Sequence, residues 1–485
     1  MGLALRRPLV FAALAALAGG IALAGCVEAY AQDKGLEARV DSVFAEYDNT
    51  RSPGCALGVI RDGRLVFKRG YGMAVLEHGI PNSPTTVFRI GSTSKQFTAA
   101  AIVLLAAEGK LSLDDDIRRF LPEMRDYGTP VTIRHLLHHT SGVRDYLTLM
   151  SLAGRRDDDW YTDDEVVTMV ARQRELNFEP GERMLYSNSG YFLLSQIVKR
   201  ASGMSLREYA ADRIFGPLGM EHSHFHDDHA EIVPNRASGY APAEDGGFRI
   251  SMTTLDMVGD GGVFTTVEDL YRWDQNFYRP RFGGQSFLDR LLNRGVLSNG
   301  DTLDYALGLG HAVYRGLPVV RHGGAFVGFR ADMMRFPSER FTVICLCNLS
   351  TAPPWRLAER VADIYLEDRL APVEEEPEEG REEAEEEEQP LELSAEQLAE
   401  YAGDYYSEEL DVTYRLRVVD DTLRLFLGNW LDSPLVPAEP DVFRARVLTF
   451  RFTREPPQRP SGFLLDAGRV RNLRFERVEE RVDGR

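Results

Sequence analysis

A run of glutamates constrains the fold of this chain more than any other feature. Residues 374–388 read EEEPEEGREEAEEEE, with eleven glutamates and one arginine. Such a block repels itself and has too little apolar surface to be buried, so it remains in solvent as a linker. The sequence therefore predicts two folded parts, residues 35–370 and 392–485, joined by an acidic linker over residues 371–391.

The same run carries much of the chain's acidity. The 485 residues include 56 basic and 75 acidic side chains, which give a formal net charge of −19. One arginine against eleven glutamates gives the run −10 of this charge and leaves −9 for the rest. Nucleic-acid binding needs clustered positive charge, so no nucleic-acid partner is expected. A hydrophobic content of 44% excludes a wholly disordered chain.

The first residues have the three parts of a secretory signal. Arginines at residues 6–7 precede an apolar, uncharged stretch at residues 8–25 that ends in small residues. The end of this stretch reads LAGC and resembles a bacterial lipobox, so we assign residues 1–26 to the signal and predict lipidation of Cys26. Cleavage after residues 29–31 (AYA) is the alternative. Lipidation at Cys26 predicts an exported periplasmic lipoprotein anchored to a membrane, whereas cleavage after residue 31 predicts a secreted soluble protein.

Three further cysteines lie in apolar runs. Cys345 and Cys347 are two apart on a predicted strand, about 7 Å from each other, which is too far for a bridge between them. Cys55 belongs to another apolar run and could pair with one of them. Burial is the common fate of free cysteine, so three buried free thiols are the favoured interpretation.

The first folded part has a mixed pattern. Residues 56–71 read as two strands around a tight turn, and residues 319–349 as further strands. Between them, residues 94–108 and 190–201 read as helices that end at Gly109 and Gly203. This order predicts a sheet whose edges come from both ends of the domain, with helices between.

The second folded part alternates short apolar runs with turns. Such a pattern is typical of a small antiparallel sheet or barrel. The predicted strands cover residues 412–418, 423–427, 447–452, 463–465 and 470–475.

Ser92 and Lys95 form the first candidate catalytic pair, where an extended segment turns into the predicted helix. A serine hydroxyl is a poor nucleophile unless a neighbour takes its proton. Residues three apart share a helix face, so the two side chains meet. Free N–H groups at a helix start can stabilise an oxyanion. Alone, this S-x-x-K pattern is weak, because a capping serine and a solvated lysine would look the same.

The second and third candidate motifs are Tyr186-Ser187-Asn188 and His322-Gly323-Gly324-Ala325. A phenol held near an ammonium can share proton transfer, and Asn188 can hold a substrate amide. Paired glycines in a strand let a substrate approach closely, with the N–H of Ala325 as an oxyanion donor. A helix cap and a hairpin bend are the structural alternatives.

Together the three motifs resemble those of the penicillin-recognising serine hydrolases: class C β-lactamases, DD-carboxypeptidases, D-aminopeptidases and related esterases. Residues 133–142 (IRHLLHHTSG) and 259–266 (GDGGVFTT) also look like signatures of this branch. The resemblance covers residues 40–365. It implies an α/β (α+β) β-lactamase/transpeptidase-like domain with an antiparallel sheet and a helical subdomain. The second part is similar to the lipocalin-like β-domain often appended to such hydrolases.

The resemblance also implies residue roles and no cofactor. Ser92 is similar to the acylated nucleophile, and Lys95 and Tyr186 to the pair that activates it, with the identity of the base left open. Asn188 resembles the group that contacts the substrate amide. The third motif and the N–H groups of Ser92 and Ala325 match the substrate-binding strand and the oxyanion hole.

The third motif departs from the family pattern. Members that hydrolyse β-lactams or peptides usually have lysine, then threonine or serine, then glycine, whereas this chain has His322-Gly323-Gly324. A permanent cation is replaced by a group that is mostly neutral at pH 7. An esterase or D-amino-acid peptidase or amidase with weak or no β-lactamase activity is therefore expected. Its substrate is a small ester, amide or peptide, and a β-lactamase or DD-carboxypeptidase is the alternative.

Two other classes of protein remain open. His222, His224, His226 and His229 form the densest histidine cluster and could bind zinc, although the chain has no H-E-x-x-H pattern. We expect no metal site, because the cluster lies in a polar stretch. A binding protein that kept the fold without catalysis is the other alternative.

Overall fold

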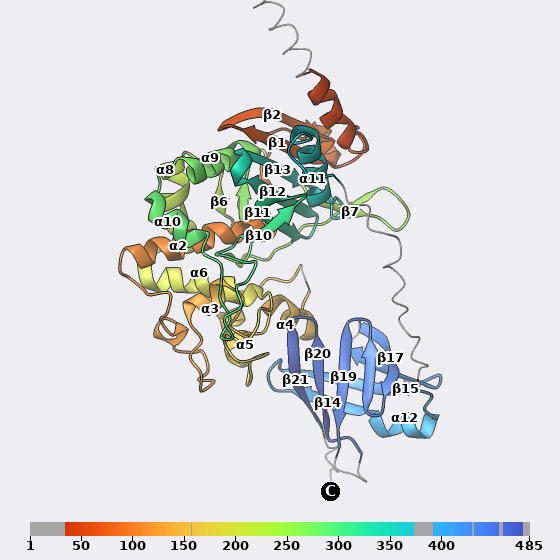
Figure 1. The fold of residues 1–485 in the computed structure, drawn as a ribbon. Helices are drawn as coiled ribbons and strands as arrows, with labels where there is room; N and C mark the ends of the chain where they lie inside the picture. Colours follow the sequence, from red (N-terminus) through yellow and green to blue (C-terminus); the bar gives the residue numbers. More distant parts are fainter. Residues whose placement is uncertain (1–33, 157, 373–390, 429–430, 455–458, 479–485) are drawn as a thin grey trace, which may run out of the picture.

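The computed structural model describes residues 34–156, 158–372, 391–428, 431–454 and 459–478. The predicted signal, with Cys26, and most of the acidic linker lie outside the described residues. The described parts form a mixed α/β domain and a separate β-barrel, as the sequence predicts (Figure 1). None of the described helices is long and apolar enough to span a membrane.

A six-stranded antiparallel sheet forms one end of the first domain (Figure 1). Its strand order, β10-β11-β12-β13-β1-β2, joins the two ends of the domain at the β13–β1 pair. The strands are β1 (Cys55–Arg61), β2 (Arg64–Tyr71), β10 (Gly310–Tyr314), β11 (Leu317–Phe326), β12 (Phe329–Phe336) and β13 (Phe341–Cys347). One edge comes from early residues and the other from late residues, which confirms the predicted arrangement.

Both faces of this sheet are covered. Along β1, Leu57 and Val59 pack into a core shared with α11 (Pro354–Tyr365), while Ala56 and Ile60 pack into the larger core with α2 (Lys95–Ala107). A strand buried on both faces has no polar alternation. The apolar run of β1 follows from this position.

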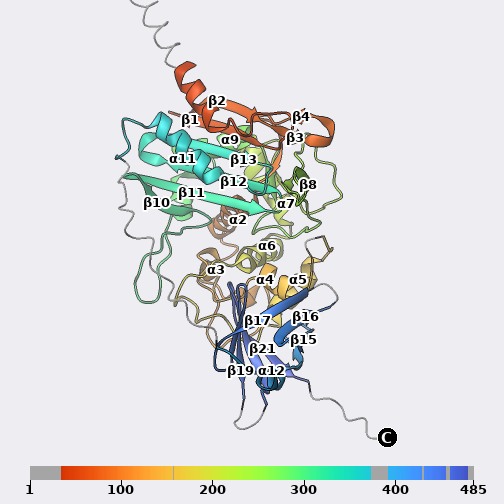
Figure 2. The same ribbon diagram turned by 90° about the vertical axis from the view of Figure 1, so that its right-hand side faces the viewer.

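The helical region lies between the sheet and the barrel (Figure 2). Here α6 packs against the lower side of α2, α3 and α4 pack against α6, and α5 packs against α4 (Figure 1). The bounds of these helices are α3 (Ile133–Leu137), α4 (Tyr146–Leu152), α5 (Asp163–Ala171) and α6 (Asn188–Ser202). The domain also contains α7 (Leu206–Ala210), α8 (Gly216–Leu218), α9 (Val267–Tyr278), which packs against β1 and β13, and α10 (Gly284–Leu291). Short strands complete the domain: β3 (Met73–Val75), β4 (Ile80–Pro81), β5 (Phe88–Arg89), β6 (His224–Phe225), β7 (Tyr240–Pro242), β8 (Phe248–Ile250) and β9 (Val263–Thr265).

The two predicted helices are present with shifted starts. The first begins as a 3-10 turn, η2 (Gly91–Ser94), before α2. The second, α6, begins at Asn188, two residues earlier than predicted, so Asn188 lies in the helix rather than on a loop. Its backbone N–H donates to Asp145, 43 residues away, at 2.7 Å. Because the residue that caps this helix comes from a distant part of the chain, the sequence around residue 188 does not show where the helix begins.

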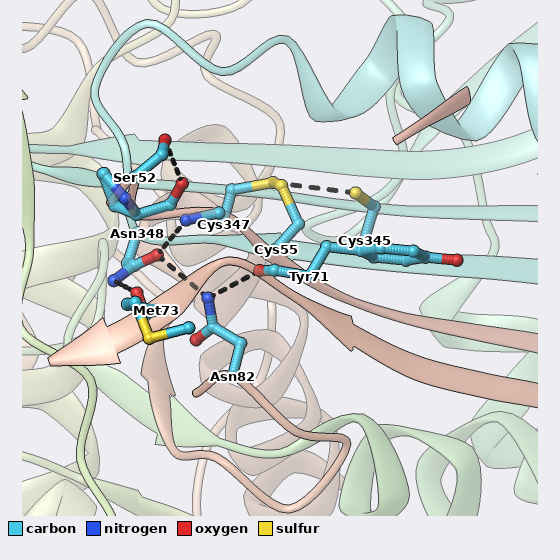
Figure 3. The surroundings of a disulfide bond; sticks show 10 residues. Ser52, Cys55, Tyr71, Met73, Asn82, Cys345, Cys347 and Asn348 are labelled. Atoms are coloured by element: carbon cyan, nitrogen blue, oxygen red, sulfur yellow. Dashed lines mark hydrogen bonds between the residues drawn. A yellow bond between two sulfur atoms is a disulfide. The ribbon is translucent and has the colours of Figure 1, made fainter. Parts of the chain in front are cut away.

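The interpretation of three free thiols is wrong. Cys55 and Cys347 form a disulfide, and only Cys345 is a free cysteine among the described residues (Figure 3). The two cysteines stand opposite each other on the neighbouring antiparallel strands β1 and β13, with their Cα atoms 4.0 Å apart. This pairing depends on the sheet register, since 292 residues separate the two in sequence.

The second domain is a closed antiparallel barrel of β14 to β21, preceded by α12 (Ala395–Tyr401). Its strands are β14 (Gly403–Ser407), β15 (Val412–Val419), β16 (Thr422–Leu427), β17 (Leu431–Glu439), β18 (Val442–Ala445), β19 (Leu448–Thr453), β20 (Gly462–Ala467) and β21 (Val470–Arg477). The sequence predicted five of them. It missed β14, β17 and β18. The strand β17 contains Pro434 and Pro437 and a register shift, and proline is unusual within strands.

The barrel packs against the helical region below α4 and α5 (Figures 1 and 2). The Tyr414 hydroxyl of β15 donates to the Leu152 carbonyl at the end of α4, at 2.8 Å. Asn177 exchanges hydrogen bonds with the backbone of Arg469 and Arg471 in the β20–β21 hairpin. The hairpin therefore lies against the domain that carries the predicted catalytic residues.

Candidate active site

Ser92 lies on η2, which packs directly against β11. A Cβ atom on Gly91 would stand 2.8 Å from the Ala325 nitrogen, and one on Gly324 would stand 1.9 Å from the Ile90 carbonyl oxygen. Glycine is needed at both positions because the two backbones approach so closely. The approach brings the peptide N–H of Ala325 next to the turn that presents Ser92, as an oxyanion hole requires.

Lys95 is completely buried beneath Ser92. Its ammonium donates to Ser92 Oγ at 3.2 Å, to Asn188 Oδ1 at 2.9 Å and to the Asp260 carbonyl at 2.5 Å. Burial lowers the Lys95 pKa to about 8, although the charges of Asp260 and Asp145 oppose this shift. A lysine with this pKa can give up its proton near neutral pH.

Tyr186 closes the other side of the nucleophile. The Lys95 ammonium stands 4.8 Å from the centre of the Tyr186 ring. The buried Tyr186 hydroxyl has no hydrogen-bond partner among the described residues. Burial raises the Tyr186 pKa, and the nearby Ser92 hydroxyl lowers it in part. Tyr186 is therefore a neutral phenol with a proton available for an incoming group.

His322 of the third motif is held as a neutral imidazole. Its Nδ1 donates to the Gly323 carbonyl at 2.6 Å, so its Nε2 accepts from the Tyr305 hydroxyl at 3.0 Å. His139 lies on the other side of Tyr305, 3.2 Å from the hydroxyl, and its Nδ1 accepts from the Ser187 N–H. Burial, together with the Lys95 charge, lowers the His322 pKa to about 4. The site thus has no cation where the family usually has a lysine.

One cavity of about 560 Å³ unites the predicted residues. Its lining includes Ser92, Tyr186, Asn188, His322, Gly323, Gly324 and Ala325. Lys95 lies directly below this lining. The structure therefore brings all eight predicted residues together.

Several residues in the cavity wall and behind it were not predicted from the sequence. Asp260 and Tyr146 line it, and the Tyr146 hydroxyl donates to Asp260 Oδ2 at 3.2 Å. Asp260 belongs to the GDGG signature and His139 to the HHTSG signature, so the sequence marked both without giving them a role. Tyr305 stands in no motif, and only the fold brings it to His322.

The barrel contributes Arg469 to the cavity wall. Its guanidinium stacks over the Tyr186 ring at 4.8 Å and lies 3.8 Å from the Asp145 carboxylate. This positive charge helps to lower the pKa of Lys95 and of Tyr186. The arginine lies between the predicted strands at residues 463–465 and 470–475, but only the packing of the two domains places it here.

The histidine cluster is held by an ion-pair network. His224 Nε2 and His226 Nδ1 are 3.2 Å apart, and Glu231 lies close enough for the three to share a metal ion. However, Arg207 binds both carboxylate oxygens of Glu231, at 2.7 and 2.8 Å. His229 pairs with Asp256 instead. A metal would have to displace the arginine, so these side chains fit a structural role better.

Comparison with known proteins agrees with this geometry. Residues 40–366 match the Beta-lactamase family, and the chain belongs to that family. It is similar to a D-aminopeptidase of Gluconobacter oxydans, with 31% identity over 65% of this chain and 59% of the relative. The chain thus spans less than two thirds of the length of this curated relative.

Solved structures share the fold. A penicillin-binding protein homologue from Pyrococcus abyssi, described as octameric, covers 91% of this chain and 99% of its own, with 24% identity and a TM-score of 0.61. A D-amino acid amidase from Ochrobactrum anthropi covers 69% of this chain and 99% of its own, with 22% identity and a TM-score of 0.57. The first likeness extends over most of both domains, whereas the second is limited to a smaller share of the chain.

Proposed function

We propose that this protein is an exported serine hydrolase that cleaves amide bonds of D-amino acids through an acyl-enzyme on Ser92. The observation that supports this proposal most strongly is the buried Lys95 ammonium, which lies 3.2 Å from the Oγ atom of Ser92, a residue that lines the cavity. The D-aminopeptidase relative supports the stereochemistry and the bond type. A D-amino acid amidase shares the fold of the first domain, which is compatible with this activity.

Lys95 is the general base for Ser92 in this mechanism. Two of its three partners, Asn188 Oδ1 and the Asp260 carbonyl, can only accept hydrogen bonds. A neutral amine keeps both with its two N–H bonds and turns its lone pair toward Ser92 Oγ. Lys95 then takes the hydroxyl proton as Oγ attacks the substrate carbonyl.

Tyr186 delivers a proton to the leaving nitrogen. The attack forms a tetrahedral intermediate, whose oxyanion is stabilised by the N–H groups of Ser92 and Ala325. Collapse of the intermediate breaks the C–N bond, and the Tyr186 proton passes to the departing amine. The Lys95 ammonium then returns its proton to the Tyr186 oxygen. This transfer is short because both side chains lie beside Ser92. Water then attacks the acyl-enzyme with the same groups and releases the acid.

Efficient β-lactam hydrolysis is not expected. A neutral His322 cannot provide the permanent cation that would hold the carboxylate of a β-lactam at the third motif. D-amino acid amides carry no carboxylate and do not need this cation. The departure from the family motif therefore favours amide or ester substrates.

A hydrolysis screen tests the proposal. The purified protein is offered D- and L-alanine p-nitroanilide, a p-nitrophenyl ester and a chromogenic β-lactam. We expect D-anilide and ester cleavage that Ser92→Ala removes, with a loss of about 10⁶-fold in kcat. Preference for the L-anilide, or activity that survives Ser92→Ala, would contradict the proposal.

Export and lipidation of Cys26 belong to the same proposal. The Cys55–Cys347 disulfide supports it, because disulfides persist mainly in oxidising compartments. The mass of the mature amino terminus distinguishes the possibilities. A lipidated Cys26 supports the anchored form, an amino terminus at Gln32 supports the secreted form, and an intact Met1 contradicts export.

A further inference from the structure

Asp260 lines the active-site cavity and has a buried carboxylate oxygen that is unpaired among the described residues. The residue is 7% exposed, and its Oδ1 is buried without a hydrogen-bond partner among the described residues. Its other oxygen accepts from the Tyr146 hydroxyl at 3.2 Å. A buried carboxylate oxygen without a donor is costly, so a position of this kind indicates a missing cationic or hydrogen-bonding partner.

The cavity offers this partner a single acidic side chain. Of the described residues that line the cavity, Asp260 alone is acidic. Neighbouring groups leave Oδ1 free: Arg89 donates to the Leu255 carbonyl and stacks on Phe326, 4.8 Å from its ring centre. Lys95 contacts the Asp260 carbonyl rather than its carboxylate. Asp145 also faces this region and is occupied by the N–H groups of Asn188 and Thr148.

Asp260 lies close to the reacting atoms. Lys95 Nζ is 3.2 Å from Ser92 Oγ and 2.5 Å from the Asp260 carbonyl oxygen, so one ammonium group joins the nucleophile to this residue. In an α-amino acid derivative, the amino group stands on the carbon next to the attacked carbonyl. A substrate acylating Ser92 therefore carries its α-nitrogen into the neighbourhood of Asp260.

We propose that Asp260 binds the α-ammonium group of the substrate, so that the hydrolase acts on a residue with a free amino terminus. This inference rests on the proposed function and narrows its substrate class to amino-terminal D-residues and D-amino acid amides. The ammonium donates to Oδ1 and supplies the absent partner. Substrates whose α-nitrogen is acylated lose this charge and place an amide against a carboxylate that can only accept.

The test compares D-alanine p-nitroanilide with its N-acetyl derivative. We expect the wild-type protein to favour the free amine by on the order of 10- to 100-fold in kcat/KM, the range for a hydrogen bond to a charged group. Asp260→Asn should reduce this preference to about twofold. Asp256→Asn is the matched control, because Asp256 lies four residues earlier and pairs with His229 rather than lining the cavity.

A second measurement separates this inference from the proposed hydrolysis. A fluorophosphonate labels Ser92 with loss of fluoride, and a bound ligand slows the labelling whether or not it is cleaved. D-alaninamide should protect wild-type Ser92 at concentrations at which N-acetyl-D-alaninamide does not, and Asp260→Asn should remove the difference. If neither anilide is cleaved but the difference in protection is observed, the proposed hydrolysis is contradicted and the role of Asp260 is not. Equal protection by both ligands, or equal cleavage of both anilides by the wild type, overturns the role of Asp260 even if Asp260→Asn does not fold.

Discussion

Arg144 and Glu409 meet across the two domains, with Arg144 Nη1 2.6 Å from Glu409 Oε1 and both side chains buried. The same guanidinium donates to the carbonyls of Arg471 and Asn472 in β21 and to Gln173. Nearly all of its hydrogen-bonding capacity is therefore directed to the domain boundary. Removing one partner of such a pair leaves an uncompensated buried charge.

The residues that follow Arg144 in the chain connect this ion pair to the catalytic residues. Arg144 begins a three-residue segment that holds the start of α6: its carbonyl accepts from Ser189 Oγ, and Asp145 accepts from the Asn188 N–H. Tyr146, the third residue, donates to Asp260. The barrel thus fixes a segment that positions the groups around Lys95.

Glu409→Gln should lower catalytic activity although the residue lies outside the cavity. We expect kcat to fall by about tenfold with KM changed less than about twofold, because small misplacements of catalytic groups reduce the rate strongly. The free energy of unfolding should fall by about 3 kcal/mol. Steady-state kinetics with a p-nitrophenyl ester and denaturant unfolding measure the two effects.

The neighbouring Glu408 provides the control. It pairs with Arg174 across the same boundary, but both side chains are exposed, and such pairs contribute little. Glu408→Gln should leave kcat and stability almost unchanged. Equal effects of the two substitutions would mean that the boundary as a whole, rather than the Arg144–Glu409 pair, maintains the site.

The pH dependence should report the ionisation of Lys95. If Lys95 acts as the base, kcat/KM rises as pH passes through its pKa of about 8, because only the neutral amine accepts the Ser92 proton. The positive charge of Arg469 lowers this pKa, so Arg469→Ala should raise it and move the acid limb to higher pH. Activity at pH 7 should fall more than activity at pH 9.

Arg471→Ala is the control for this shift. Arg471 belongs to the same hairpin, but its side chain pairs with Asp466 and does not line the cavity. Its pH profile should match the wild type. An acid limb that stays in place in Arg469→Ala would show that the barrel charge does not act on Lys95.

The disulfide gives a prediction that needs no substrate. In a chain that lacks Cys26, alkylation in denaturant should modify only Cys345 before reduction, and Cys55 and Cys347 as well after reduction. Mass spectrometry counts the additions. Reduction should also lower the free energy of unfolding by about 2–5 kcal/mol, because the bond restricts the unfolded chain. Three additions before reduction would contradict the pairing.

The sequence predicted those parts of the site whose residues lie close together along the chain. Ser92 and Lys95 are three residues apart, so a helix start suffices to bring them together. Asp145 and Asn188, or Arg144 and Glu409, meet only after the domains fold, and neither pair has a local signal. The disulfide was missed for the same reason, since the register of β1 against β13 pairs Cys55 with Cys347. The acidic run predicted two folded parts but gave no sign that residues of both would line one cavity, as Arg469 of the barrel does.

Tyr186→Phe should separate the two halves of the proton transfer. An amide needs a protonated leaving nitrogen, whereas p-nitrophenolate leaves without a proton. If Lys95 activates Ser92 and Tyr186 serves the leaving group, hydrolysis of D-alaninamide should fall by about 10²- to 10⁴-fold, while acylation by a p-nitrophenyl ester should fall by much less. Removing the hydroxyl breaks no hydrogen bond to the described residues, so the fold should tolerate the change. Pre-steady-state release of p-nitrophenol measures acylation, and ammonia release measures amide cleavage. Equal losses for both substrates would instead make Tyr186 the base that activates Ser92.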